Sequence, residues 1–175
     1  KTPSRVYKYN LATKEKSLVK EQEIPSGHNP DDYIVERVEF KSHDGRLVPL
    51  TITRHKKTKL DGSANLLLYG YGSYGSSMSP IFSSTRLSLI NRDIIWATAH
   101  IRGGMEKGMK WWKEGKLTNK KNTFEDYIFA AKFLIENKNQ AANVLTEKVK
   151  RVMDVAIDKE VEKFENKLTF LATVG

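Results

Sequence analysis

The sequence predicts an α/β fold in which strand hairpins come first and a strand–helix–strand–helix series follows. Two short apolar runs, at residues 66–69 and 94–99, have the continuous hydrophobicity of strands that are buried on both faces of a sheet. Helix patterns follow both runs, and this alternation is typical of a parallel sheet covered by helices. From residue 144 to residue 171, apolar residues recur at helical spacing without Gly or Pro. That segment predicts one long amphipathic helix at the C-terminal end.

The first 60 residues predict two hairpins joined by an irregular connector. Apolar residues alternate with polar ones on both sides of the polar turn at residues 13–15, which indicates a weak first hairpin. Residues 25–31 are rich in Pro, Gly, Asn and Asp and predict the connector. The Asp44-Gly45 dipeptide between two further alternating runs predicts the second hairpin. Pro49 cannot donate a ladder hydrogen bond, so we expect its strand at a sheet edge.

Two helices are expected in the α/β part. Ser79 followed by Pro80 is typical of an N-cap residue and a first helical position, so a helix is expected from there to about Asn91. Thr123, with Asp126 three residues later, has the spacing of a capping box. This spacing predicts that the second helix starts at Thr123.

Composition limits the classes of function. The net charge is +9, but no long basic run with interleaved aromatic residues occurs, so we favour a Lys-rich solvated surface over a nucleic-acid interface. There is no cysteine and the four histidines lack metal-ligand spacing, so neither a metal nor a cofactor is expected. No apolar run approaches the roughly 20 residues of a membrane helix. With no secretory signal at the start, these features predict a cytoplasmic protein.

The most informative segment is residues 69–75, Tyr-Gly-Tyr-Gly-Ser-Tyr-Gly, directly after the first buried run. Gly70, Gly72 and Gly75 satisfy the G-x-G-x-x-G pattern of dinucleotide-binding loops, whose amides would hold a pyrophosphate. That alternative is disfavoured because the helix pattern begins only at Ser79, whereas the dinucleotide motif needs the helix N-terminus beside the phosphates.

Together with downstream motifs, this segment resembles the prolyl oligopeptidase family of serine peptidases, and most closely its oligopeptidase B branch. The downstream motifs, in the order of the family, are Arg102-Gly103-Gly104-Met105-Glu106, Trp111-Trp112, Gly115, and Asn122-Thr123-Phe124-Glu125-Asp126. The resemblance covers about residues 5–137. It implies a partial α/β-hydrolase domain, a peptide substrate, and a family activity of hydrolysing peptides after basic residues.

The resemblance also implies roles for individual residues. In the family, the second Tyr of the motif donates its hydroxyl to the oxyanion of the tetrahedral intermediate, and the aromatic residue three positions later lines the specificity pocket. Tyr71 and Tyr74 occupy these positions. One such oxyanion donor is worth about 2.7–4 kcal/mol in acyl transfer. Arg102, Gly103 and Gly104 are expected to shape the loop beside the site. Arg102 would pair with Glu106 or another carboxylate, and a plain surface position for it is an equal alternative.

The residues that would complete a peptidase site are not found. No serine lies in a G-x-S-x-G elbow, and all four histidines precede the position of the base in the family. We therefore expect a truncated serine peptidase that is inactive, because one oxyanion donor without a nucleophile forms no acyl-enzyme. An incomplete sheet is also expected to unfold with poor cooperativity or to aggregate.

The C-terminal part resembles another family, the TolQ and ExbB proton channels, at the helix that leads into their second membrane span. The resemblance rests on the stretches 151–154 and 170–175 and on Glu160. We therefore predict three units. Residues 1–40 would be the end of a propeller-like region with a linker, residues 41–138 the first part of a peptidase domain, and residues 139–175 an unrelated amphipathic helix. The alternative function is an interaction module that binds a membrane complex through residues 144–175.

Overall fold

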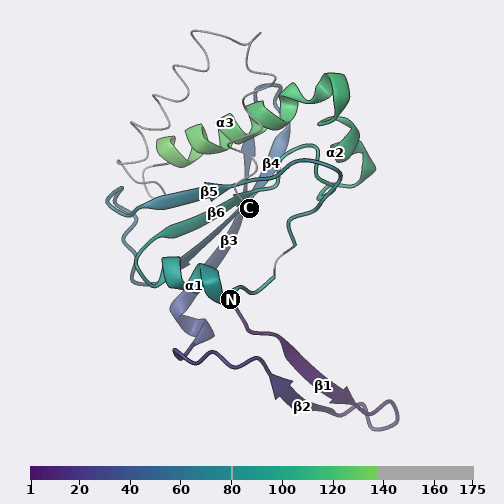
Figure 1. The fold of residues 1–175 in the computed structure, drawn as a ribbon, viewed down its shortest axis with the longest axis vertical. Helices are drawn as coiled ribbons and strands as arrows, with labels where there is room; N and C mark the ends of the chain where they lie inside the picture. The colour runs from purple at the N-terminus through teal and green to yellow at the C-terminus, as the bar shows by residue number, and fades with distance from the viewer. Residues whose placement is uncertain (80, 138–175) are drawn as a thin grey trace.

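The computed structural model describes residues 1–79 and 81–137, which form a two-stranded hairpin and a mixed four-stranded sheet with helices on both faces (Figure 1). The expected α/β architecture is thereby confirmed, whereas the helix expected at residues 144–171 lies outside the described residues. The elements are β1 (Arg5–Tyr9), β2 (Lys16–Glu21), η1 (Pro30–Asp32), β3 (Tyr33–Lys41), β4 (Leu47–His55), β5 (Leu66–Tyr69), α1 (Ser84–Ile90), β6 (Ile95–Ala99), α2 (Met109–Lys113), η2 (Leu117–Asn119) and α3 (Lys121–Glu136).

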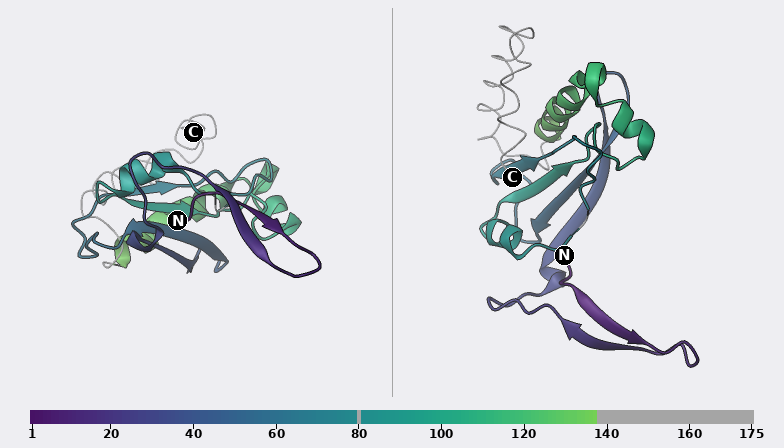
Figure 2. Two further views of the ribbon diagram at one scale, coloured as in Figure 1. Left: turned by 90° about the horizontal axis from the view of Figure 1, so that it is seen from below. Right: turned by 45° about the vertical axis from the view of Figure 1, so that its right-hand side comes forward.

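Strands β1 and β2 form the expected first hairpin, which extends away from the four-stranded sheet (Figure 2). Arg5 pairs with Glu21 at its open end, where the guanidinium and carboxylate are 2.9 Å apart. The apolar side chains of the hairpin are exposed on its surface. The hairpin therefore adds little to the core that positions the candidate site.

The four-stranded sheet has the order β3-β4-β6-β5. Strands β3, β4 and β6 are antiparallel neighbours, whereas β5 and β6 run parallel, with Tyr69 beside Thr98. The prediction that Pro49 marks an edge strand is wrong, because β4 pairs with β3 on one side and with β6 on the other. The amide of His100, the residue directly after β6, donates to the carbonyl of Pro49. Pro49 therefore lies opposite His100, beyond the end of β6, and this is where its N–H is missing. The proline therefore removes no bond of the β4–β6 ladder.

The alternation of side chains along β6 separates two apolar clusters. Ile95, Ala97 and Ala99 are buried against α3 in the larger cluster, together with residues of β4. Trp96 points to the opposite face and packs on the smaller cluster around α1. The two helices therefore cover opposite faces of the sheet, as expected for an α/β layer structure. In the described part of the chain, no helix combines the length and apolar composition needed to cross a membrane.

Both predicted helix starts are wrong. The N-cap of α1 is Ser83, whose Oγ accepts a hydrogen bond from the amide of Arg86 at 3.4 Å, whereas the carbonyl of Ser79 accepts from the amide of Ile81. Helix α3 already begins at Lys121. Thr123 lies inside its first turn and uses its hydroxyl for a tertiary contact, because the backbone before it is already helical.

Candidate active site

The candidate site lies where the strands β5 and β6 end. Because these strands are parallel, their carboxyl ends meet at the same edge of the sheet, and the segments that follow them lie together. The segment after β5 is residues 70–75, called here the tyrosine loop, and the segment after β6 contains Arg102, Gly103 and Gly104. Residues that are about 30 positions apart in the sequence therefore form one structural unit.

The glycines of the tyrosine loop allow its backbone to approach this second segment closely. Gly72 has φ +61°, and a Cβ atom there would lie 2.5 Å from Cγ2 of Thr123 and 2.8 Å from the carbonyl oxygen of Arg102. The amide of Gly75 donates to the carbonyl of Gly103 at 2.9 Å. Because that amide is already bonded and the next helix starts only at Ser84, the loop does not have the geometry of a dinucleotide-binding motif.

The two tyrosines of the predicted site differ in exposure. Tyr71 is half-buried, whereas Tyr74 is 90% exposed and has φ +54°, a left-handed conformation that is uncommon for a residue other than glycine. Such conformations persist only where the surroundings impose them, and they cluster at functional sites. The loop thus presents Tyr74 to solvent at the end of the sheet.

Arg102 is fully buried in an ion-pair network, so the alternative of a plain surface position is wrong. Its side chain is 1% exposed and that of Asp126 is 0% exposed. The guanidinium donates to both carboxylate oxygens of Asp126, through Nη2 at 2.6 Å and Nε at 2.9 Å, and the amide of Arg102 donates to the same carboxylate at 2.9 Å. The backbone and side chain of Arg102 are thus both fixed by one residue of α3.

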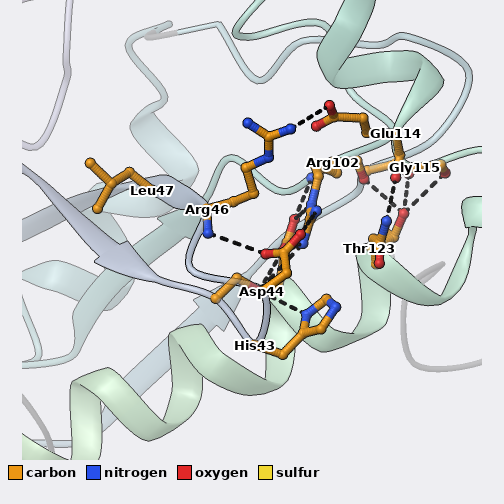
Figure 3. Close-up of polar contacts among 12 residues, drawn as sticks. His43, Asp44, Arg46, Leu47, Arg102, Glu114, Gly115 and Thr123 are labelled. Atoms are coloured by element: carbon orange, nitrogen blue, oxygen red, sulfur yellow. Dashed lines mark hydrogen bonds and ion pairs between the residues drawn. The ribbon is translucent and has the colours of Figure 1, made fainter.

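A second carboxylate reaches Arg102 from the β3–β4 turn, as Figure 3 shows. Asp44 Oδ2 accepts from Nη1 of Arg102 at 2.6 Å, and Ser42 donates its hydroxyl to Asp126 at 2.6 Å. Burial disfavours the charge on Arg102, but hydrogen bonds to Asp126 and Asp44 outweigh this effect and raise its pKa. Burial likewise opposes ionisation of Asp44, but its bond with Arg102 leaves the pKa of Asp44 below the usual range. The network joins the β3–β4 turn, the segment after β6 and α3.

Of the two partners expected for Arg102, Glu106 is wrong and a carboxylate elsewhere is confirmed, since Arg102 pairs with Asp126 and Asp44. Glu106 accepts instead from the amide of Met78 at 2.9 Å, and its carboxylate lies 3.7 Å from Nδ1 of His100. Sequence reasoning placed Asp126 in a motif but missed it as the partner of Arg102. The motif order itself was the signal, since it placed an acidic residue on the helix that follows the Arg-Gly-Gly segment.

Three glycines let the backbones at the site pack without side chains. Gly103 has φ +98°, and a Cβ atom there would clash with the carbonyl oxygen of Gly72. A Cβ atom at Gly104 would clash with the carboxylate of Glu106, and one at Gly115 would clash with the amide of Gly103. Gly103 and Gly115 therefore require glycine for close approach of the backbones, whereas a side chain at Gly104 would require the carboxylate of Glu106 to move.

Thr123 and Trp111 complete the packing of the segment after β6. The hydroxyl of Thr123 lies 2.7 Å from the carbonyl of Arg102 and 3.1 Å from that of Gly115. Its single hydrogen can be donated to only one of them at a time, and the shorter contact is to Arg102. Trp111 is buried and donates its indole N–H to the carbonyl of His100 at 3.0 Å. No cluster of three or more His, Asp or Glu side chains suited to a metal is found in the described ranges.

Comparison with known proteins finds peptidases that are similar to this chain. The model described as Prolyl oligopeptidase family matches residues 80–145. Dipeptidyl aminopeptidase BI from Pseudoxanthomonas mexicana is 43% identical over 136 residues, and Protease 2 from Moraxella lacunata is 38% identical over 135 residues. This part of the chain belongs to the prolyl oligopeptidase family.

Solved structures of the prolyl oligopeptidase family contain a region with the fold of this chain. Oligopeptidase B from Leishmania major superimposes with a TM-score of 0.72 at 38% identity and covers 79% of this chain. Prolyl oligopeptidase B from Galerina marginata, bound to a 35mer hydrolysis and macrocyclization substrate, superimposes with a TM-score of 0.75 and covers 81% of it. The match covers about a fifth of each relative, 19% of Dipeptidyl aminopeptidase BI and 20% of Protease 2. None of these relatives is a TolQ or ExbB protein, so that resemblance stays a prediction about residues outside the described ranges.

Proposed function

We propose that this chain derives from a serine peptidase of the prolyl oligopeptidase family and carries the part of the site that binds the oxyanion and the substrate peptide. The observation that carries the proposal is the tyrosine loop, held against the Arg102-Gly103 segment in a region 43% identical to Dipeptidyl aminopeptidase BI. Tyr71 is the proposed oxyanion donor, and Tyr74 is the proposed contact to the substrate.

The chemistry assigned to Tyr71 is acyl transfer. A nucleophilic hydroxyl attacks the peptide carbonyl, and negative charge develops on the carbonyl oxygen. A tyrosine hydroxyl that donates to this oxygen lowers the barrier without exchanging a proton. Arg102 and Asp126 have no direct part in this step. Their role is to fix the loop segments at the end of the sheet.

We further propose that these 175 residues by themselves do not hydrolyse peptide bonds. None of their serines lies in a G-x-S-x-G elbow, so the residues present supply no nucleophile of the kind used by α/β-hydrolases. A preference for basic residues rests on the resemblance to oligopeptidase B alone. The names of the relatives, which include prolyl and dipeptidyl peptidases, support only the broader class of peptide substrates.

Two experiments test the proposal. The 175-residue chain is incubated with an Arg-containing chromogenic peptide and with a serine-reactive phosphonate. Neither turnover nor labelling is expected, and phosphonate-sensitive turnover would contradict the inactivity.

In the second experiment, residues of this chain replace the matching segment of Dipeptidyl aminopeptidase BI, and Tyr71→Phe is compared with Tyr69→Phe in the chimera. Loss of one oxyanion donor is expected to lower kcat by about 10²–10³-fold. The Tyr69 control is expected to keep the activity of the parent chimera. An equal effect of the two substitutions would refute the role of Tyr71.

A further inference from the structure

Lys120, the residue directly before α3, joins this helix to the tyrosine loop. Its ammonium donates a hydrogen bond to the carbonyl oxygen of Gly72 at 2.7 Å and another to the hydroxyl of Ser73 at 2.7 Å. Gly72 and Ser73 are the two residues between Tyr71 and Tyr74. Within the described residues, Lys120 is the one charged side chain that hydrogen-bonds to the tyrosine loop.

The environment of Lys120 is unusual for a lysine. Its side chain is half-buried, and this burial lowers the pKa of Lys120, the direction expected for an ammonium removed from water. An exposed lysine would keep its hydration and its side-chain freedom. The two charge-assisted hydrogen bonds to the loop offset the loss of both.

The adjacent Lys121 provides a natural comparison. It is exposed, as expected for a lysine in the first turn of a surface helix. The two neighbours therefore have the same charge and nearly the same place in the sequence, but only Lys120 is directed at the loop.

We propose that Lys120 is a positioning residue, which orders the tyrosine loop and thereby sets the Tyr71 hydroxyl and the Tyr74 ring. The inference rests on the proposed function, because it takes these two tyrosines as the site residues. Gly103 holds the same loop through a neutral contact, because its carbonyl accepts a hydrogen bond from the amide of Gly75. Lys120 contacts it at the centre, between the two tyrosines, so its loss frees both side chains together.

The test uses the full 175-residue chain and three variants. Lys120→Met removes the donors and keeps a side chain of similar length, Lys120→Arg keeps donors for both acceptors, and Lys121→Met is the matched control. Cleavage by chymotrypsin under native conditions is followed after Tyr71 and Tyr74, and after the buried residues Phe40 and Trp111. The NMR signals of ¹³C-labelled tyrosine rings are recorded in parallel.

Lys120→Met is expected to raise the rate of cleavage in the tyrosine loop by about 10–100-fold, because the loop loses its hydrogen bonds to a charged group. Cleavage after Phe40 and Trp111 is expected to stay unchanged, and the ring signals of Tyr71 and Tyr74 are expected to broaden or shift. Lys120→Arg and Lys121→Met are expected to behave like the parent chain.

Two outcomes would overturn the inference. Cleavage of Lys120→Met at the parental rate would show that the contact does not order the loop. An equal rise at the loop and at the buried sites would show a plain stabilising residue instead. The chimera with Tyr71→Phe tests the proposed function separately, so a normal loop in Lys120→Met leaves that proposal untouched.

Discussion

Replacement of Asp126 by Asn is the most direct test of the network that holds the candidate site. The substitution keeps the size of the side chain but removes the charge that compensates Arg102, which is 1% exposed. Removal of one partner of a buried ion pair costs about 3–5 kcal/mol, because the remaining charge is left without compensation. Asp44 still contacts the guanidinium, so we expect a loss of about 3 kcal/mol, at the lower end of this range.

The loss is measured as the free energy of unfolding in urea, followed by tryptophan fluorescence. Trp111 is buried near Arg102, where its ring lies 5.9 Å from the guanidinium carbon, and reports on this region. A domain of ordinary stability has a free energy of unfolding of about 5–15 kcal/mol, so a change of about 3 kcal/mol is well resolved. If the transition is broad, amide exchange in β4 and β6 gives the same comparison.

The control is Glu114→Gln, which breaks a more exposed ion pair with Arg46 at 2.9 Å. Exposed pairs contribute about 0–1 kcal/mol, so the control should change stability little. The double variant Arg102→Met with Asp126→Leu should be less destabilised than Asp126→Asn, since it leaves no fully buried charge without a partner, and the carboxylate of Asp44 is 34% exposed and can be hydrated. If Asp126→Asn is as stable as Glu114→Gln, the reasoning about the buried pair is refuted.

Three further predictions concern packing, pH and association. Gly103→Ala should destabilise the chain more than Gly108→Ala does in urea unfolding. Both glycines have positive φ, but only at Gly103 would the added Cβ clash with Gly72. Equal losses of stability would contradict the close approach. The pKa of Asp44 is lowered in the folded state, so its stabilising contact with Arg102 should be complete above about pH 4 and lost as the pH falls through the lowered value. Asp44→Asn should therefore flatten the acid side of the stability curve, and an unchanged curve would count against the contact. In the described structure β5 pairs on one side only, so association that rises with concentration is expected in light scattering, whereas a monodisperse monomer with a sharp two-state transition would argue against open-edge pairing.

The sequence predicted most elements because their signals are local. The hairpin turns at residues 13–15 and 44–45, the two buried strands and the general position of both helices all followed from turn residues and from periodicity. The helix starts were wrong although Ser79 and Thr123 have the residue types of a cap. In the fold, the carbonyl of Ser79 accepts from the amide of Ile81, and the hydroxyl of Thr123 contacts the carbonyl of Arg102. Pro49 was misplaced for a similar reason, since its strand is central but the proline falls beyond the end of its neighbour.

By itself, the sequence determined the fold class, the motif at residues 69–75 and its family, because these depend on residue types and their order. Only the tertiary structure decided which groups meet: Asp126 with Arg102 and Ser42, and Lys120 with the tyrosine loop. Ser42 and Asp126 are separated by 84 positions, so no local pattern relates them. Contacts of this kind arise when parallel strands bring distant loops to one edge of a sheet, and burial there turns an ordinary charged residue into a structural one.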